Sequence, residues 1–409
     1  MMDKSELINL TKEHMHVLCS AISERRVGGE GNRLATAFVK NKFRESGWTT
    51  DETLLEVMDW RTTGASLKCG TESFEVSSSP YSQGCIVSGE LVPVNTVEEL
   101  EKADISGKIV FLLGQIASGQ IMPKNFVFYN PEEHQKIISS LEKGNPKAII
   151  SATGRDSAVA GGVYPFPMFE DGDFDIPSVY MKDTEGEKLL ACSGQIVTLE
   201  SGAVRIPETA FNVIARKEGR TKKRIAVTAH IDAKIGTSGA IDNATGVVVL
   251  LLLSELLKDL KGEYCVELVA FNGEDYYAVP GQMKYIEQNQ GRFDEIVLNI
   301  NIDGAGYKEG LSCFSAFNLP DYISEKLDAI FKSHKNIVEG KPWVQGDHSI
   351  FVQYGCPAIA VSSEWFIDHM DNQDITHTPK DNMSIVNYER IPECALAIRD
   401  LIVSIAGNK

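Results

Sequence analysis

The chain has 409 residues, which suggests two or three domains at roughly 150 residues per domain and leaves no need for a disulfide or metal staple. Hydrophobic residues make up 43% and charged residues 24% of the chain, as is typical of a globular protein. The net charge of −17 argues against a nucleic-acid or anionic-membrane partner, because both require a basic face.

The first residues and the cysteines indicate the compartment. No basic stretch followed by an apolar run opens the chain, so we expect no signal peptide. The longest apolar run, 247–253, is far shorter than the roughly 20 residues of a membrane span. Eight cysteines are scattered without a Cys-x-x-Cys pair, which is typical of reduced thiols. These features predict a cytoplasmic protein.

Two helices, over 5–22 and 33–46, are expected first, because apolar residues recur there at helical spacing. From 63 to 206 the pattern changes to short β-type runs punctuated by glycine and serine, with two helical pieces at 131–142 and 184–192. This texture predicts a separate β-rich domain inserted into the fold.

After Asn212, strands and helices alternate. The expected strands are 225–229, 264–271, 296–302 and 357–362, and the expected helices are 246–260, 280–290, 321–333 and 391–405. Such alternation predicts an α/β fold with a mixed, mostly parallel central sheet and helices on both faces. We assign residues 1–62 and 207–409 to this catalytic domain and residues 63–206 to the insertion.

Acidic residues and histidines follow the predicted strands. His230, Glu274, Asp275 and Asp303 stand at strand ends, and Asp242 precedes the long helix. Ligands of open parallel sheets bind beyond the carboxyl ends of the strands, so these side chains should converge on one crevice. A crowd of carboxylates is costly unless cations neutralise it.

Histidine and carboxylate ligands suit zinc, and one carboxylate can bridge two ions. We expect one ion to take His230, Asp242 and Asp303, and a second to take Asp242, Asp275 and His377. A water between them would have its pKa lowered towards neutrality. Glu274 is then left to act as general base and later as general acid, and Asp232 to orient His230 through its other ring N–H.

The ordered set of motifs resembles the co-catalytic zinc aminopeptidases related to aminopeptidase S and aminopeptidase Y, with glutamate carboxypeptidase II and glutaminyl cyclases as relatives. The motifs are His230-Ile231-Asp232, Gly239 to Gly246, Asn272-Gly273-Glu274-Asp275, Asn301-Ile302-Asp303, Gly346-Asp347-His348 and His377 to Asp381. The resemblance implies the same five ligands, with Glu274 as base and Asp232 as the orienting acid. Segments 105–112 and 176–179 of the insertion resemble a protease-associated domain.

The sequence departs from this family at three positions. Asp275 stands where the family usually has glutamate. Because its side chain is one methylene shorter, binding of a single zinc ion is an alternative to binding of two. Trp343 replaces a tyrosine that stabilises the oxyanion in some relatives, and Thr376 replaces a tyrosine before the last histidine. The oxyanion donor is therefore not identified.

An acidic crevice favours a cationic peptide N-terminus over a C-terminal carboxylate. The sequence therefore predicts a metallo-aminopeptidase that acts on peptides with a free N-terminus, and it is compatible with a homo-oligomer. Two alternatives stay open at this point: a glutaminyl cyclase-like acyl transferase, and a non-catalytic binding protein that keeps the fold.

Overall fold

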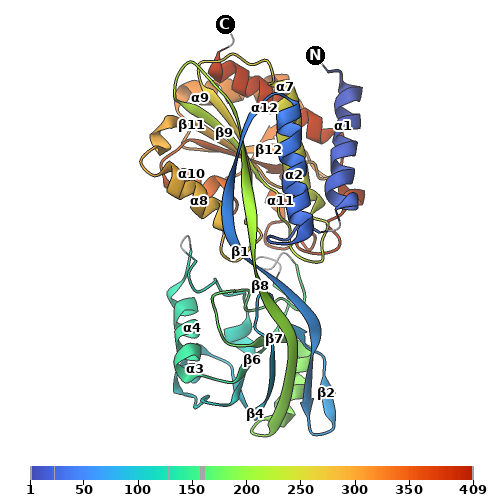
Figure 1. The fold of residues 1–409 in the computed structure, drawn as a ribbon, viewed down its shortest axis with the longest axis vertical. Coiled ribbons are helices and arrows are strands. Elements are labelled where there is room, and N and C mark those ends of the chain that lie inside the picture. The colour runs from blue at the N-terminus through green and yellow to red at the C-terminus, as the bar shows by residue number, and fades with distance from the viewer. Residues whose placement is uncertain (1, 23, 127–128, 157–161, 408–409) are drawn as a thin grey trace. The chain divides into compact units, whose positions relative to one another are not determined.

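The computed structural model describes residues 2–22, 24–126, 129–156 and 162–407. The chain forms two compact units, one of Met1–Val57 with Thr209–Lys409 and one of Met58–Glu208. Figure 1 shows the elements of both. Two long strands, β1 (Thr49–Cys69) and β8 (Ile196–Lys217), carry the chain from one unit to the other. The identity of the predicted insertion, 63–206, as a protease-associated domain stays a prediction.

The first unit is built on a mixed sheet. Its strand order is β13 (Ile337–Glu339), β12 (Ser312–Phe317), β14 (Ala358–Ser363), β11 (Ile296–Ile302), β9 (Arg224–His230), β10 (Cys265–Phe271) and β8. β14, β11, β9 and β10 run parallel, whereas β12 is antiparallel to β14 and β8 is antiparallel to β10. The predicted mixed, mostly parallel sheet is confirmed.

Burial explains the apolar strands and the apolar helix. Every residue of β9 and β10 is buried, because helices cover both faces of the sheet. α7 (Thr245–Leu256) is buried over 245–254. It packs against β9, β10 and β11 on one side and against α1 (Lys4–His16), α2 (Glu30–Glu45) and α12 (Arg390–Ala406) on the other.

The opposite face carries α8 (Pro280–Asn289) and α10 (His348–Gln353). Along β10, Leu268 and Ala270 belong to the α7 core, whereas Phe271 packs edge-on against Tyr285 of α8. Tyr285 in turn contacts Phe351 of α10. Side chains therefore alternate between two helical layers, as the pleat of a strand requires, and the prediction of helices on both faces is confirmed.

The remaining elements of this unit are short or peripheral. They are α9 (Asp321–Ser333), which packs on α12, α11 (Glu364–Asp368), the π-helical turns Val17–Ala21 and Ala240–Ala244, and the 3-10 turns Phe293–Glu295 and Met383–Ile385. The predicted helix 5–22 thus changes its hydrogen-bond pattern at Val17. Within the described ranges, no helix combines the length and the apolar character that a membrane span requires.

The second unit has its own sheet, in which β4 (Cys85–Val94), β5 (Ile109–Leu112), β6 (Ala148–Thr153) and β7 (Ser178–Lys182) run parallel. β8 pairs with β4, and the short β3 (Ser77–Ser78) with β7, both antiparallel. Ile109 and Phe111 enter one core and Val110 and Leu112 the other. The other elements here are β2 (Glu72–Phe74), α3 (Val97–Lys102), α4 (Glu132–Gly144), α6 (Asp183–Leu189) and the turns Gly114–Ala117 and Leu190–Cys192.

Candidate metal centre

The candidate site lies at the carboxyl ends of the parallel strands. His230 is the last residue of β9, Asp303 directly follows β11, and Glu274 and Asp275 follow β10. Asp242 lies in the π-helical turn that leads into α7. Because the ends of neighbouring parallel strands share one edge of the sheet, residues from separate parts of the sequence meet there.

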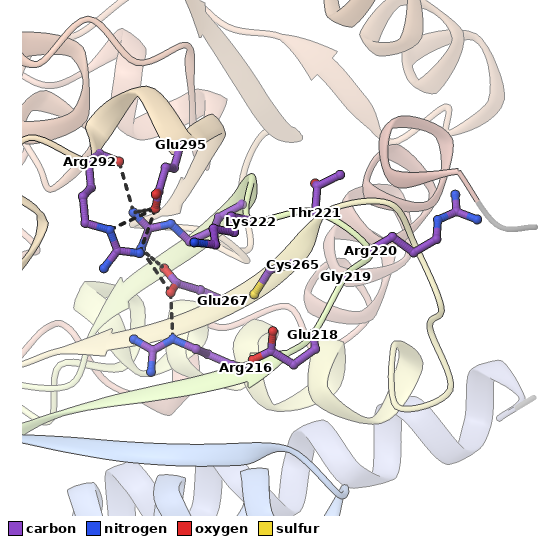
Figure 2. A pocket seen from close by; sticks show the side chains of 11 residues that line it. Arg216, Glu218, Gly219, Arg220, Thr221, Lys222, Cys265, Glu267, Arg292 and Glu295 are labelled. Carbon is purple, nitrogen blue, oxygen red and sulfur yellow. Dashed lines mark hydrogen bonds and ion pairs between the residues drawn. The ribbon is translucent and has the colours of Figure 1, made fainter.

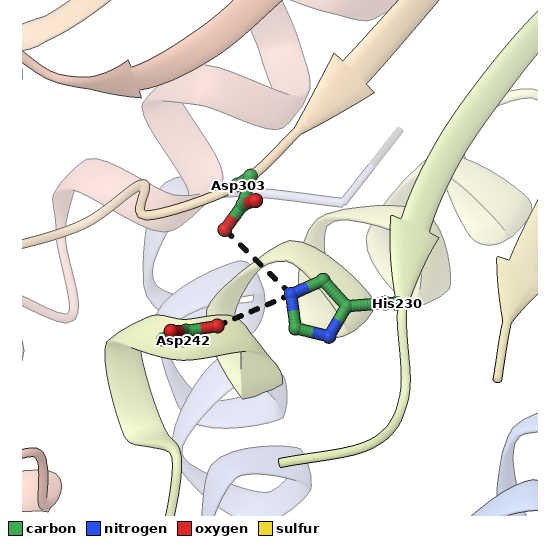
Figure 3. A group of neighbouring side chains, drawn as sticks. All are labelled: His230, Asp242 and Asp303. Carbon is green, nitrogen blue, oxygen red and sulfur yellow. Dashed lines mark ion pairs between the residues drawn. The ribbon is translucent and has the colours of Figure 1, made fainter. Parts of the chain in front are cut away.

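The first group joins His230, Asp242 and Asp303 (Figure 3). The Nε2 atom of His230 lies 3.1 Å from Oδ1 of Asp242 and 3.7 Å from Oδ1 of Asp303. His230 is 1% exposed, and its Nε2 makes no hydrogen bond of acceptable geometry. This nitrogen therefore points at carboxylate oxygens from two other elements.

The second group joins Asp242, Asp275 and His377. The Nε2 atom of His377 lies 2.9 Å from Oδ1 of Asp275 and 3.3 Å from Oδ2 of Asp242. Asp242 thus presents one carboxylate oxygen to each histidine. The structure brings together the five residues that the sequence analysis named as ligands, in the two predicted groups.

Asp232 contacts two parts of the site. Its main-chain oxygen is 3.2 Å from Nδ1 of His230, whereas its carboxylate Oδ1 is 3.7 Å from that nitrogen. The two carboxylate oxygens accept the N–H groups of Gly273 and Asp275, at 2.8 and 3.0 Å. The carboxylate therefore holds the loop after β10, and the main-chain oxygen makes the shorter contact with the imidazole.

Burial and mutual repulsion shift the carboxyl groups. Burial raises the pKa of Glu274 well above its usual value, against the opposing charge of His230 and with the repulsion of Asp303 and Asp275. Burial also raises the pKa of Asp303, although His230 opposes it. For Asp242, burial raises the pKa, but the close imidazoles of His230 and His377 outweigh it and lower that pKa.

Both histidines of the site have raised pKa values. Burial lowers the pKa of His230 and of His377, but the neighbouring carboxylates outweigh burial and hold both pKa values well above the usual one. The cluster therefore favours positive charge among its carboxylates, which protons or a divalent cation can supply. Two imidazole Nε2 atoms and several carboxylate oxygens form a donor set that fits zinc.

The other notable polar residues near these motifs do not enter either group. Asp347 accepts from Nε2 of Gln282 at 2.7 Å, and burial raises its pKa to about 7. The Nε2 atom of His348 contacts the main-chain oxygen of Trp343 at 2.9 Å. His369 stacks on Trp365. Among the described residues, His14, His16, His134, His334 and His369 all lie outside the two groups.

A separate pocket of about 620 Å³ lies at the opposite ends of the same strands (Figure 2). Its lining includes Arg224 and Cys265, the first residues of β9 and β10, and the length of a seven-residue strand places it about 20 Å from His230. Its floor is an ion-pair network in which Glu267 accepts from Arg216 and Arg224. This pocket therefore has no part in the candidate site.

The protein-family comparison identifies the segment that carries the site. Residues 212–402 match the model of peptidase family M28. The M28 segment contains His230, Asp242, Asp275, Asp303 and His377, and Glu274 with them. It begins within β8 and ends within α12, so it covers most of the first unit.

Curated and solved relatives agree with the M28 match. The chain is 21% identical over 271 residues to aminopeptidase YwaD of Bacillus subtilis, covering 62% of this chain and 55% of that protein. It is 20% identical over 360 residues to a probable leucine aminopeptidase 2 of Aspergillus oryzae, covering 87% and 64%. A third curated relative is covered over 58% of its length. The chain therefore spans between about half and two thirds of the length of the curated relatives it matches.

The solved structures share the fold along nearly the whole chain. An aminopeptidase from Aneurinibacillus sp. strain AM-1 superposes with a TM-score of 0.77 at 20% identity, covering 98% of this chain and 94% of that one. BSAP, a zinc aminopeptidase from Bacillus subtilis, superposes with a TM-score of 0.74 at 18% identity, covering 97% and 95%. The fold of this chain is therefore one that solved proteins share.

Several residues that support the loops of the site have no recognisable signature in the sequence. Arg25 and Asn32 lie outside the M28 segment and carried no signal beyond a helix break. Asn32 donates to Oδ1 of Asn272 at 2.6 Å and to the main-chain oxygen of Arg25 at 3.0 Å. Asp381 appeared only within a family motif and without a role.

Proposed function

We propose that the protein is a metal-dependent aminopeptidase that releases N-terminal residues from peptides. The observation that carries this proposal is the position of Asp242, with one carboxylate oxygen beside His230 and the other beside His377. A shared carboxylate between two histidine-containing groups is the arrangement that two-metal hydrolases use. The M28 match and the aminopeptidase relatives support it.

We propose zinc as the metal, held by His230, Asp242 and Asp303 in one position and by Asp242, Asp275 and His377 in the other. When bound, zinc polarises the scissile carbonyl and lowers the pKa of a water molecule towards neutrality. The two carboxylate oxygens of Asp232 accept the N–H groups of Gly273 and Asp275, and these hydrogen bonds keep the loop that carries Asp275 in place. Two ions are expected, since both groups offer ligands from separate elements.

Glu274 supplies the proton chemistry. It precedes Asp275 directly and is left over by both metal groups. Its carboxylate accepts a proton from the attacking water and then delivers that proton to the leaving amine. Burial raises its pKa, whereas positive charge in the crevice favours the ionised form that accepts the proton. The two influences together suit a group that serves as base first and as acid second.

The acidity of the crevice supports a preference for the peptide N-terminus. Asp242, Asp275, Asp303 and Glu274 surround the site, and an α-ammonium group is complementary to their charge. A C-terminal carboxylate would be repelled by the same residues. We therefore propose an exopeptidase that requires a free N-terminus.

The two alternatives are not favoured. A single-zinc cyclase has no use for a second complete ligand group around His377, and a binding protein that only keeps the fold has no use for either group. The named relatives are aminopeptidases. Incubation with an N-terminal glutaminyl peptide separates the readings, because release of free glutamine marks an aminopeptidase and ring closure marks a cyclase.

The test is hydrolysis of a panel of aminoacyl-p-nitroanilides before and after dialysis against a chelator. We expect the activity to disappear on chelation and to return with added zinc. An N-acetylated peptide of the same sequence serves as the control and should stay intact. Hydrolysis that survives complete removal of metal, or equal cleavage of the acetylated peptide, would contradict the proposal.

Two further assignments belong to this proposal. We propose that residues 63–206 form a protease-associated type of domain. The resembling segment 105–112 supports this, because it contains β5, which pairs in parallel with β6. We also propose a reducing, cytoplasmic location, since all eight cysteines are free thiols. The test of the proposed reducing location is a thiol titration of the protein after unfolding without reductant. We expect all eight cysteines to react.

A further inference from the structure

A fully buried arginine stands behind the candidate metal centre. Arg25 is 1% exposed. Its Nε donates to the main-chain oxygen of Ile231 at 2.8 Å, and its Nη2 donates to that of Gly239, also at 2.8 Å. Its Nη1 donates to the main-chain oxygens of Leu18 and Ser238, both at 2.7 Å. The guanidinium group thus binds backbone carbonyls on three sides.

The carbonyls that Arg25 binds frame one loop of the site. Ile231 directly follows His230, and Ser238 and Gly239 come shortly before Asp242. The segment 231–239 therefore joins two ligands of the same predicted ion. Both ends of this segment accept from one rigid, planar group, whereas Leu18 anchors that group to the end of the first helix.

A buried charge needs compensation, and carbonyl dipoles supply it here. A buried arginine is usually paired with a carboxylate, because desolvation of the charge is costly. The forked geometry of guanidinium is pre-organised, so that it can fix several acceptors at once in a way that lysine cannot. The guanidinium of Arg25 therefore fixes the distance between the main-chain oxygens at the two ends of the 231–239 loop.

Asp381 binds the adjoining backbone at Ile241 and Asp242 with its carboxylate, which accepts hydrogen bonds where Arg25 donates them. Its carboxylate, fully buried, accepts the N–H of Ile241 at 2.7 Å and the N–H of Asp242 at 3.0 Å. Its main-chain oxygen accepts the hydroxyl of Ser238 at 2.8 Å. Asp381 lies just after His377. The backbone just before and at Asp242 is thus held from two sides. The guanidinium of Arg25 binds its carbonyl oxygens, and the carboxylate of Asp381 binds its N–H groups.

Gly239 shows how closely this arrangement is packed. Its φ of +54° is left-handed. A Cβ atom there would lie 2.5 Å from the main-chain oxygen of Asp242 and 2.8 Å from Nη2 of Arg25. No side chain fits between the arginine and the backbone of Asp242, so a displacement of one is transmitted to the other.

We propose that Arg25 is a positioning residue, which fixes the 231–239 loop so that His230 and Asp242 meet the same ion in a pre-formed geometry. The proposal rests on the proposed function, since it assigns a role towards the metal. Groups behind the ligands that orient them contribute to metal affinity as well as to stability. Arg25 touches no reacting atom and acts only through the backbone of the ligands.

The sign of the effect separates positioning from simple electrostatics. Arg25 carries a positive charge, and its removal by an Arg25→Met substitution would by charge alone strengthen the binding of a cation. Loss of the fixed loop predicts the opposite, a weaker affinity for zinc. The Arg25→Lys variant keeps the charge and loses the fork, so it should also bind zinc more weakly, though less so than Arg25→Met.

The experiment measures zinc affinity of the chelator-treated protein by competition with a chromogenic chelator, and thermal unfolding of the same samples. Arg224→Met is the matched control, because Arg224 is also a buried arginine of this unit, 5% exposed, and pairs with Glu267 at the far ends of the strands. Each variant is first checked by circular dichroism for a folded state at the temperature of the titration.

We expect Arg25→Met to bind zinc about 10–100-fold more weakly than the parent, and Arg224→Met to stay within about twofold although it unfolds at a lower temperature. Parental or tighter zinc affinity in a folded Arg25→Met protein overturns the proposal, and so does an equal loss in Arg224→Met. If Arg25→Met does not fold, Arg25→Lys is judged by the same criteria. A parent protein that binds no zinc overturns the proposed function as well.

Discussion

The carboxylate of Asp242 lies 3.1 Å from Nε2 of His230 through one oxygen and 3.3 Å from Nε2 of His377 through the other. His230 ends a central strand, whereas His377 stands in a loop before the last helix. One short side chain therefore links the two halves of the candidate centre. Its removal should affect both halves, whereas removal of any other ligand should affect one.

We expect Asp242→Asn to lose both metal content and activity. The amide cannot offer two anionic oxygens, and since groups that merely orient ligands cost 10–100-fold in affinity, a direct bridging ligand should cost at least about 100-fold in kcat/KM. Metal per chain, measured by plasma emission spectroscopy, should fall together with the activity. Asp374→Asn is the control, because Asp374 lies in the same loop as His377 but forms an exposed ion pair with Lys380. Unchanged metal content in Asp242→Asn would refute the bridging role.

Glu274→Gln should separate chemistry from metal binding. The amide keeps the shape of Glu274 but can no longer accept a proton, so kcat should fall between about 100-fold and 10,000-fold. Zinc content should stay at the parental value, because Glu274 belongs to neither ligand group. The variant should unfold at an equal or higher temperature, since burial disfavours the charge that is removed. Parental kcat at full zinc occupancy would show that another group moves the proton.

The carboxyl ends of the central strands could be located from the sequence more readily than the partly exposed strands of the fold. His230 and Asp303 could be placed because buried parallel strands appear as apolar runs, and the end of a run marks the edge of the sheet where ligands meet. Half-exposed strands give no such run. β1 extends from Thr49 to Cys69 with many exposed polar residues, so its length could not be predicted from an apolar run.

Buried charges are the second class that sequence reasoning missed. Arg25 precedes a glycine turn and looks like an ordinary surface arginine, because its four partners are backbone carbonyls with no sequence signature. Glu267 interrupts the apolar run of β10 and is 1% exposed. Its burial depends on Arg216 and Arg224 from two neighbouring strands, and pairings across a sheet are fixed only by the register of the fold.

Glu267→Gln should destabilise the protein without affecting the metal centre. Glu267 accepts from Nε of Arg216 at 2.8 Å and from Nη1 of Arg224 at 3.2 Å (Figure 2). Loss of the carboxylate leaves the buried Arg224 with only a longer ion pair, to Glu295 at 3.8 Å, which should cost about 3–5 kcal/mol in the free energy of unfolding. Urea denaturation measures this cost. Glu287→Gln, at the exposed pair with Lys284, should cost no more than about 1 kcal/mol, and an equal loss in the two variants would contradict the importance of burial.

The stability of the protein should fall in mild acid through His14. Burial, together with the smaller effect of the Lys42 charge, lowers the pKa of this histidine from 6.5 to about 4. The unfolded chain therefore binds the proton more tightly than the folded chain, so His14 stabilises the fold above pH 6.5 and loses that contribution as the pH falls towards 4. Between pH 7.5 and pH 5 the free energy of unfolding should drop by about 2 kcal/mol from this group alone.

His14→Leu tests this origin of the acid sensitivity. The imidazole is 2% exposed, its Nδ1 has no hydrogen-bond partner, and its ring meets Phe38 edge-on, so an apolar side chain of similar size can replace it. Urea denaturation at pH 7.5 and at pH 5 should show a smaller difference in the variant than in the parent. His16→Leu, on the exposed side of the same helix, should retain the parental difference. A parental pH dependence in His14→Leu would assign the acid sensitivity to other groups, because a side chain that cannot bind a proton makes no contribution to proton linkage.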